Sequence, residues 1–180
     1  MIFLILGILL WSIPHLLRRF APERRAQMGD KGRGPIALAI ILGVVLMVIG
    51  YRMADGPYWW GRTSATTGIN NLLMLVSVYL FAASGMKTRV TRLIRHPQLT
   101  AVILWAIAHL LVNGDLPSFV LFGSLFIWAL AEMSLINRSE SWTPPSPGPA
   151  RKEIMALVGT VIVFGVLGGV HYLFGLQVFG

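Results

Sequence analysis

Six long apolar runs, each bounded by short polar or basic segments, constrain this chain more than any other feature. They cover approximately residues 1–17, 35–51, 68–85, 97–112, 118–136 and 154–174. As helices, runs of this length cross all or most of the roughly 30 Å hydrocarbon core of a bilayer. The chain is 56% hydrophobic and only 12% charged, and a soluble domain of 180 residues cannot bury that much apolar surface. The sequence therefore predicts an all-α polytopic membrane protein, with a single domain over residues 1–180 built as a bundle of six transmembrane helices.

The basic residues fall almost entirely on one side of such a bundle. Of the 15 Lys and Arg residues, six lie in residues 18–33, four in 87–95 and three in 138–152. Only Arg52 and Arg62 lie in the alternate loops. Because basic loops stay in the cytoplasm, this segregation predicts that both termini lie outside. The formal net charge of +8 then indicates membrane topology and contact with anionic lipid, and no binding of nucleic acid.

Histidine is the main candidate ligand for a metal or for haem iron in this chain. No cysteine is present, which excludes disulfides, cysteine-bound zinc or iron–sulfur clusters, and a cysteine nucleophile. The four histidines are His15, His96, His109 and His171. A histidine within a membrane helix indicates a functional site, with a hydrogen-bonded structural role as the alternative. Because the chain has no CxxCH motif, any haem would be non-covalently bound haem b.

The positions of the histidines limit which pairs share one iron. His96 and His109 are 13 residues apart on one predicted helix, which separates them by roughly 20 Å and places them on different faces. Depth in the membrane pairs His109 with His171 in the outer half, and His15 with His96 toward the cytoplasm. A pair of His15 and His109 requires helix tilt or an offset of about two helical turns.

Other polar and small residues carry further predictions. Glu132 is predicted to form an ion pair with an interfacial arginine, and a proton relay or substrate contact is the alternative. Asp115 is predicted to cap the next helix, with orientation of His109 as the second interpretation. Gly165 and Gly169 form a GxxxG pattern that predicts a close helix contact.

The stretch around the fourth run resembles the NnrU family of bacterial membrane proteins. Its residues are Arg95-His96-Pro97-Gln98-Leu99, then Trp105, Ala108-His109 and Asn113-Gly114-Asp115, which form an RHP…W-x-x-A-H-x-x-x-N-G-D pattern. The similarity covers nearly the whole chain. It implies a multi-pass protein of the bacterial inner (cytoplasmic) membrane, associated with denitrification and nitric oxide metabolism.

The resemblance extends to plant 15-cis-ζ-carotene isomerase, a more distant relative with the same domain. That enzyme binds haem b through histidines and isomerises a carotenoid double bond. Carried over by motif, its two proposed haem ligands fall on His15 and His109, and its RHPQ histidine falls on His96. A cysteine of the isomerase corresponds to Ala106 here, so ligand exchange through that thiol is unavailable. This difference argues against carotenoid isomerase activity more than against haem binding.

Two classes of function follow from the histidines and the resemblance. The first is a haem b-binding membrane protein that supports nitric oxide metabolism by maturing, assisting or passing electrons to nitric oxide reductase or another membrane redox protein. The second is a haem-dependent isomerase or redox enzyme that acts on a hydrophobic polyene such as a carotenoid. The resemblance favours His15 as the partner of His109, with His171 as the alternative, and use of all four histidines would give two sites. A methyltransferase-like activity and a scaffold with structural histidines complete the alternatives.

Overall fold

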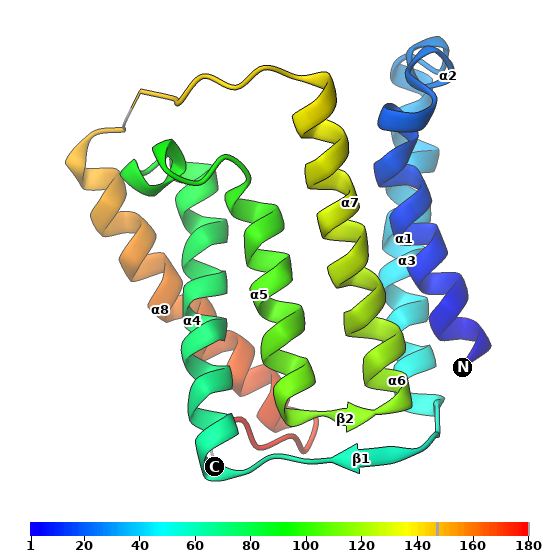
Figure 1. Ribbon diagram of the computed structural model, residues 1–180, viewed down its shortest axis with the longest axis vertical. Coiled ribbons are helices and arrows are strands. Elements are labelled where there is room, and N and C mark those ends of the chain that lie inside the picture. Colours follow the sequence, from blue (N-terminus) through cyan, green and yellow to red (C-terminus); the bar gives the residue numbers. More distant parts are fainter. Residues whose placement is uncertain (147, 180) are drawn as a thin grey trace.

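The computed structural model describes residues 1–146 and 148–179 and is a bundle of helices with one short pair of strands (Figure 1). The elements, in chain order, are α1 (Ile2–Phe20), α2 (Pro22–Gln27), η1 (Asp30–Gly32), α3 (Arg33–Met53), β1 (Tyr58–Trp60), α4 (Ser64–Met86), η2 (Arg89–Arg92), α5 (Pro97–Val112), β2 (Gly114–Asp115), α6 (Leu116–Ser118), η3 (Phe119–Gly123), α7 (Ser124–Ser139) and α8 (Ala150–Leu173). The segment η3 is a π-helical turn between α6 and α7.

The prediction of an all-α membrane protein is confirmed. Within the described residues, five helical segments are long and apolar enough to span a membrane: α1, Asp30–Met53, α4, Leu116–Ser139 and α8. The apolar helix α5 is shorter, with 16 residues. It begins and ends at the predicted positions because Pro97 suits the first helical turn and Asn113-Gly114 leaves the helical conformation.

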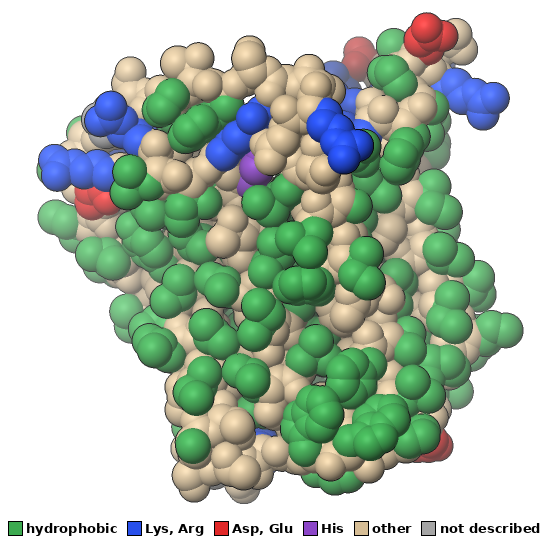
Figure 2. Space-filling view, in the orientation of Figure 1, with side chains coloured by type: hydrophobic (Ala, Val, Ile, Leu, Met, Phe, Trp, Pro, Cys, Tyr) green, Lys and Arg blue, Asp and Glu red, His purple; other side chains and the backbone are tan. Residues whose placement is uncertain are grey.

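The helices pack side by side in the order α8, α4, α5, α7, α1 and α3, which differs from their order in the chain. Both ends of the described chain lie at the end of the bundle that carries β1 and β2, which we call the strand end (Figure 1). The opposite end carries residues 18–33, 87–95, 138–146 and 148–152, and we call it the basic end. Lys and Arg side chains gather there, above a broad belt of hydrophobic side chains (Figure 2).

Small residues let α1 and α3 pack closely, whereas the predicted GxxxG contact does not form. A Cβ added at Gly7 would lie 2.6 Å from the backbone nitrogen of Met47, and one at Gly43 would lie 2.9 Å from the backbone nitrogen of Trp11. Around Gly165 and Gly169, by contrast, no described atom beyond the adjacent part of α8 itself lies within 4 Å of an added Cβ. The prediction of a close contact at these two glycines is therefore wrong within this chain, because their face of α8 has no neighbouring helix.

Two side-chain hydrogen bonds join α4 to α5. Ser77 donates through Oγ to the carbonyl of Ala101 at 2.8 Å, and Asn70 donates through Nδ2 to the carbonyl of Ala108 at 2.8 Å. Hydrogen bonds of this kind stabilise helix pairs in lipid, where no hydrophobic force acts between helices. The second bond fixes the turn of α5 that carries the next residue, His109.

Candidate functional site

A cavity of about 500 Å³ lies near the strand end, between α3, α4, α5, η3, α7 and α8. Cavities of this size are typical of sites for small molecules and cofactors. Most of its wall is apolar, and its polar side chains are Tyr51, Arg52, Arg62, Thr67, Asn70, His109, Asn113 and His171. Within the described chain, α3 and α8 have no extensive contact with each other, so the packing order leaves the bundle open between them.

His109 is held in one orientation by its own helix and by an aromatic ring. Its Nδ1 lies 2.8 Å from the carbonyl oxygen of Trp105, one turn earlier in α5. Because a carbonyl only accepts hydrogen bonds, Nδ1 carries the proton and the lone pair of a neutral ring is on Nε2. The ring also stacks on Phe122, with centroids 4.6 Å apart and an interplanar angle of 25°. Phe122 belongs to the π-helical turn η3, and such turns are frequent at functional sites.

His171 lines the same cavity from α8 and has the same internal hydrogen bond. Its Nδ1 donates to the carbonyl of Leu167 at 2.8 Å. A neutral His171 therefore also has its lone pair on Nε2. Histidines that ligate a metal usually donate their other ring nitrogen to a carbonyl or carboxylate, which fixes the tautomer and raises the basicity of the ligating nitrogen. The cavity thus joins two imidazoles, from α5 and α8, that are both in the tautomer suited to ligation.

The other two histidines lie elsewhere. His15 packs between Trp11 and Trp128, with ring centroids 4.4 Å and 5.3 Å away, and its Nδ1 donates to the carbonyl of Trp11 at 2.7 Å. His96 precedes α5 at the basic end, where its Nε2 lies 2.8 Å from Oδ1 of Asn137. The structure therefore brings His109 and His171 to one cavity and places His15 and His96 outside it.

The seam between α1 and α7 contains a largely buried ion pair, one helical turn beyond His15 in α1. Arg19 donates from Nε to Oε1 of Glu132 at 3.0 Å and from Nη1 to Glu140 at 2.6 Å. The prediction that Glu132 pairs with an interfacial arginine is confirmed. Among described atoms, its Oε2 and the indole nitrogens of Trp11 and Trp128 have no hydrogen-bond partner. A separate hollow of about 490 Å³ beside Arg19 is lined by basic-end residues and contains no histidine.

The helix cap predicted at Asp115 is also confirmed, and a chain of hydrogen bonds leads from it to the wall of the cavity. Asp115 accepts hydrogen bonds from the backbone nitrogen and from Oγ of Ser118, at 2.8 Å and 3.0 Å. Since Ser118 donates its hydroxyl proton to Asp115, the Tyr51 hydroxyl, 2.8 Å from Ser118 Oγ, is the donor of the next bond. A phenol, a hydroxyl and a carboxylate therefore connect the cavity wall to the turn at the strand end.

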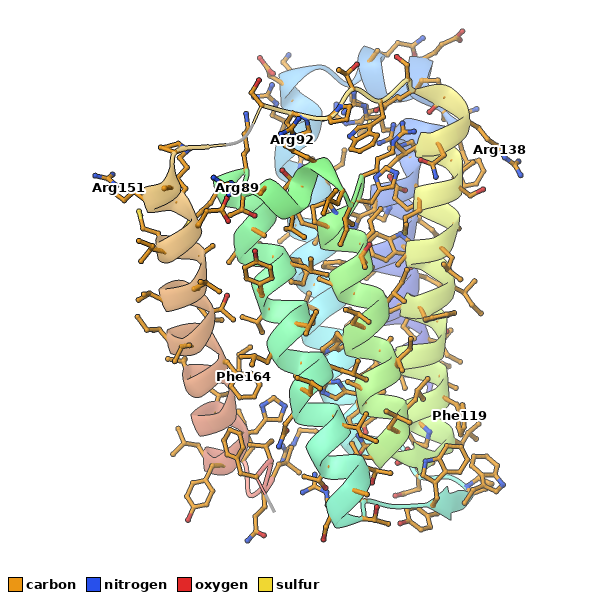
Figure 3. The ribbon with its side chains drawn as sticks, turned by 60° about the vertical axis from the view of Figure 1, so that its left-hand side comes forward. Arg89, Arg92, Phe119, Arg138, Arg151 and Phe164 are labelled. Atoms are coloured by element: carbon orange, nitrogen blue, oxygen red, sulfur yellow. The ribbon has the colours of Figure 1, made fainter. Side chains whose placement is uncertain are left out.

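Arg52 and Arg62 are the two arginines that line the cavity, and the sequence did not mark them as site residues. The Arg52 guanidinium lies 5.4 Å from the centroid of the Phe174 ring, and Arg62 donates to the backbone carbonyl of Gln177. Both contact the segment after α8, residues 174–178, part of which lines the cavity. By contrast, the four arginines labelled in Figure 3, Arg89, Arg92, Arg138 and Arg151, lie at the basic end. One feature of the sequence did distinguish Arg52 and Arg62: they are the two basic residues that lie outside the three basic segments.

In the part of the chain that the structure describes, no three His, Asp or Glu side chains gather closely enough to hold a bare metal ion. A metal already chelated by a macrocycle needs only one or two further ligands from the protein. His109 and His171 could supply these, since both line the cavity with Nδ1 hydrogen-bonded to a carbonyl. The apolar wall and the two arginines add suitable surroundings for an apolar macrocycle with acidic substituents. The residues present thus fit haem b.

The fold and the cavity define a multi-pass helical membrane protein with a histidine-containing cavity near one end of its bundle. The family model described as NnrU protein matches residues 3–178, nearly the whole chain, and the chain therefore belongs to the NnrU family. Membership in this family suggests a role related to nitric oxide or denitrification. Comparisons with curated proteins and with solved structures found no match.

Proposed function

We propose that this protein binds haem b in the bacterial inner membrane and supports nitric oxide metabolism, by maturing or assisting nitric oxide reductase or by passing electrons to it. The observation that carries the proposal is the pair of imidazoles, His109 and His171, that line one apolar cavity with Nδ1 engaged and Nε2 available. Bound haem b supplies reversible one-electron chemistry.

Each wall of the cavity has a separate part in this function. His109 and His171 would hold the iron, and the hydrogen bonds from their Nδ1 atoms to the carbonyls of Trp105 and Leu167 keep the rings from rotating. Phe122 restricts the position of His109 further by stacking on it. The apolar wall excludes water from the ring of the cofactor. His15 is the alternative partner of His109, as the family resemblance implies, although it packs against Trp11 and Trp128 and does not line the cavity.

The proposed topology has six spans, with both termini outside and the basic end in the cytoplasm. Thirteen of the 15 Lys and Arg residues lie in the segments that form the basic end, as the positive-inside rule requires. The sixth span is α5, whose 16 residues give a length of about 24 Å. Although this is shorter than the bilayer core, α5 packs between α4 and α7, which shield it from lipid. The cavity then lies toward the outer, periplasmic face.

The second candidate function is a haem-dependent isomerase or redox enzyme that acts on a hydrophobic polyene. The weak contact between α3 and α8 favours it, because a substrate dissolved in lipid would enter the cavity directly from the bilayer. A hydrophobic molecule that co-purifies with the protein and is chemically altered by it would support this candidate over the first.

The decisive experiment is an oxidised and a reduced absorption spectrum of protein purified from haem-replete cells, followed by a pyridine haemochrome. We expect sharp reduced α and β bands and a shifted Soret band, which identify low-spin haem b with two histidine ligands. His109→Ala should lose the haem or the low-spin spectrum, and His171→Ala should do the same. His96→Ala is the matched control and should behave like the wild type.

The same spectra separate the possible ligand pairs. If His15→Ala removes the low-spin spectrum and His171→Ala does not, then His15 is the partner of His109. A wild-type protein without haem after expression and reconstitution with excess haem would contradict the proposed function altogether.

A further inference from the structure

The two arginines outside the basic end converge on one cavity. Arg52 lies in the last turn of α3, and Arg62 lies in the loop before α4, ten residues later. The other Lys and Arg residues lie in the three segments of the basic end. Positive charge outside the cytoplasmic loops opposes the usual topology signal, so charge placed there indicates a local function. Here both charges line the cavity that contains His109 and His171.

Neither arginine is neutralised by an acidic side chain in the described residues. The ion pairs found there join Arg19 to Glu132 and Glu140, and Arg33 to Asp30. Among the described residues, two acidic side chains lie near the strand end. Asp55, in the loop after α3, forms no ion pair with either arginine, and Asp115 accepts both of its hydrogen bonds from Ser118.

The contacts that the arginines do make leave most of their donors free. A guanidinium has five N–H donors in a rigid fork, and among the described residues Arg62 makes one hydrogen bond and Arg52 makes one cation–π contact. Such forks bind carboxylates and phosphates with two parallel hydrogen bonds. The pair therefore forms a cationic rim that can bind an anion at the mouth of an apolar cavity.

We propose that Arg52 and Arg62 bind the carboxylates of an amphipathic ligand whose apolar body occupies the cavity between His109 and His171. The proposal rests on the proposed function, in which that ligand is haem b, and it assigns the two propionates to the two arginines. The arginines are then positioning residues: they fix the orientation of the macrocycle, with its acidic edge at the strand end and its apolar edge deeper in the bundle.

Phosphate on an anionic lipid headgroup has related chemistry, but the cavity favours the cofactor. A lipid would use one arginine or both for its headgroup and would need no imidazole. The cavity instead presents two imidazoles with available Nε2 atoms behind two cations. This combination matches a ligand with one metal centre and two carboxylates.

The test measures haem affinity of the full-length apoprotein in nanodiscs of zwitterionic lipid, with haem b and with its dimethyl ester as probes. Arg52→Gln and Arg62→Gln should each weaken haem b binding by about three- to tenfold. A loss of this size corresponds to an interaction stronger than an exposed ion pair and no stronger than a charge-assisted hydrogen bond. The same variants should bind the dimethyl ester as the wild type does, because the ester offers no carboxylate. Arg52→Lys should recover part of the lost affinity, and Arg138→Gln, an exposed arginine at the basic end, is the control.

A second measurement is independent of affinity. In the double variant the absorption spectrum should stay low-spin, whereas the midpoint potential of the bound haem should fall. Without the arginines the propionate charges are no longer compensated, and their field stabilises the ferric form. A purely structural role of the arginines in holding residues 174–178 would weaken the acid and the ester equally.

Several outcomes would overturn the inference. Equal loss of affinity for haem b and its ester in the variants refutes carboxylate binding, as does unchanged affinity for both. If the variants differ from the wild type only in nanodiscs that contain anionic lipid, the arginines bind headgroups instead. Failure of the wild type itself to bind either probe contradicts the proposed function, whereas wild-type binding that the arginine variants leave unchanged contradicts only this inference, so the two failures are distinguishable.

Discussion

Removal of Arg19 should destabilise the protein more than removal of both Arg19 and Glu132. Their side chains are only 15% and 11% exposed, and Nε lies 3.0 Å from Oε1. At an effective dielectric constant of about 20, two unit charges at this distance attract each other by about 5–6 kcal/mol, before the cost of desolvation is subtracted. Arg19→Met leaves the Glu132 carboxylate buried without a partner, since its Oε2 already has none among the described atoms. Breaking a buried pair in this way costs about 3–5 kcal/mol.

Replacement of both partners should recover most of that loss. In Arg19→Met/Glu132→Leu no charge remains in the seam between α1 and α7, and apolar replacement of a buried ion pair is often nearly neutral. We expect the double variant to lie within about 1 kcal/mol of the wild type in unfolding free energy. The unfolding free energy of Glu132→Leu alone should lie between those of Arg19→Met and of the double variant, because Arg19 keeps its bond to Glu140.

Reversible unfolding by SDS in mixed micelles, followed by circular dichroism, measures these differences in one protein background. Trp11 and Trp128 flank the seam, and their fluorescence gives a second probe of the same transition. An Arg19→Met variant as stable as the wild type, or a double variant as unstable as Arg19→Met, would refute the conclusion that this ion pair is buried and coupled.

Three further perturbations test other parts of the structure. Phe122→Ala should lower the unfolding free energy by about 3 kcal/mol and broaden the haem spectrum, because it removes a buried ring stacked on the cavity histidine; thermal melts and absorption spectra check both effects. Gly43→Val should destabilise the α1–α3 pair by about 1–3 kcal/mol, since its Cβ would meet backbone atoms that cannot move aside, whereas Gly165→Val should be nearly neutral in the same denaturation assay. The hydrogen bond from Arg19 lowers the pKa of Glu140, so the stabilisation from this bond is present above the usual glutamate pKa and is lost as the pH falls through the lowered value; unfolding midpoints measured against pH should lose that acid dependence in Glu140→Gln.

The elements of the fold were predictable because hydropathy and helix ends are local properties. The bounds of α5 follow from Pro97 and from Asn113-Gly114, which act within one turn. The order of packing was not predictable, because similar apolar faces give no information about their partners. The GxxxG pattern on α8 illustrates this: its glycines face no helix, whereas Gly7 and Gly43, which form no such pattern, make the close contact.

The candidate site was predictable in part. Depth alone placed His109 and His171 at the same level, and the structure has both in one cavity. Depth could not show that Trp11 and Trp128 would enclose His15, because that contact depends on which helices are neighbours. The π-helical turn that carries Phe122 left no sequence signal, since it results from one residue more than an α-helical turn holds, within an otherwise uniform apolar run. The ion pair of Glu132 and the helix cap at Asp115 were predicted correctly. A buried carboxylate needs a charged partner, and the free N–H groups at the start of a helix need an acceptor.

The segment after α8 has a consequence for the biosynthesis of this protein. Residues 174–178 and His171 supply one side of the cavity, and they are synthesised after every other residue that lines it. The α1–α3 pair, in contrast, packs through glycines near the beginning of the chain and can form while translation continues. The side of the cavity formed by α8 and residues 174–178 is therefore the last to be translated. Under the proposed function, haem b would be held by both histidines only after synthesis has passed His171.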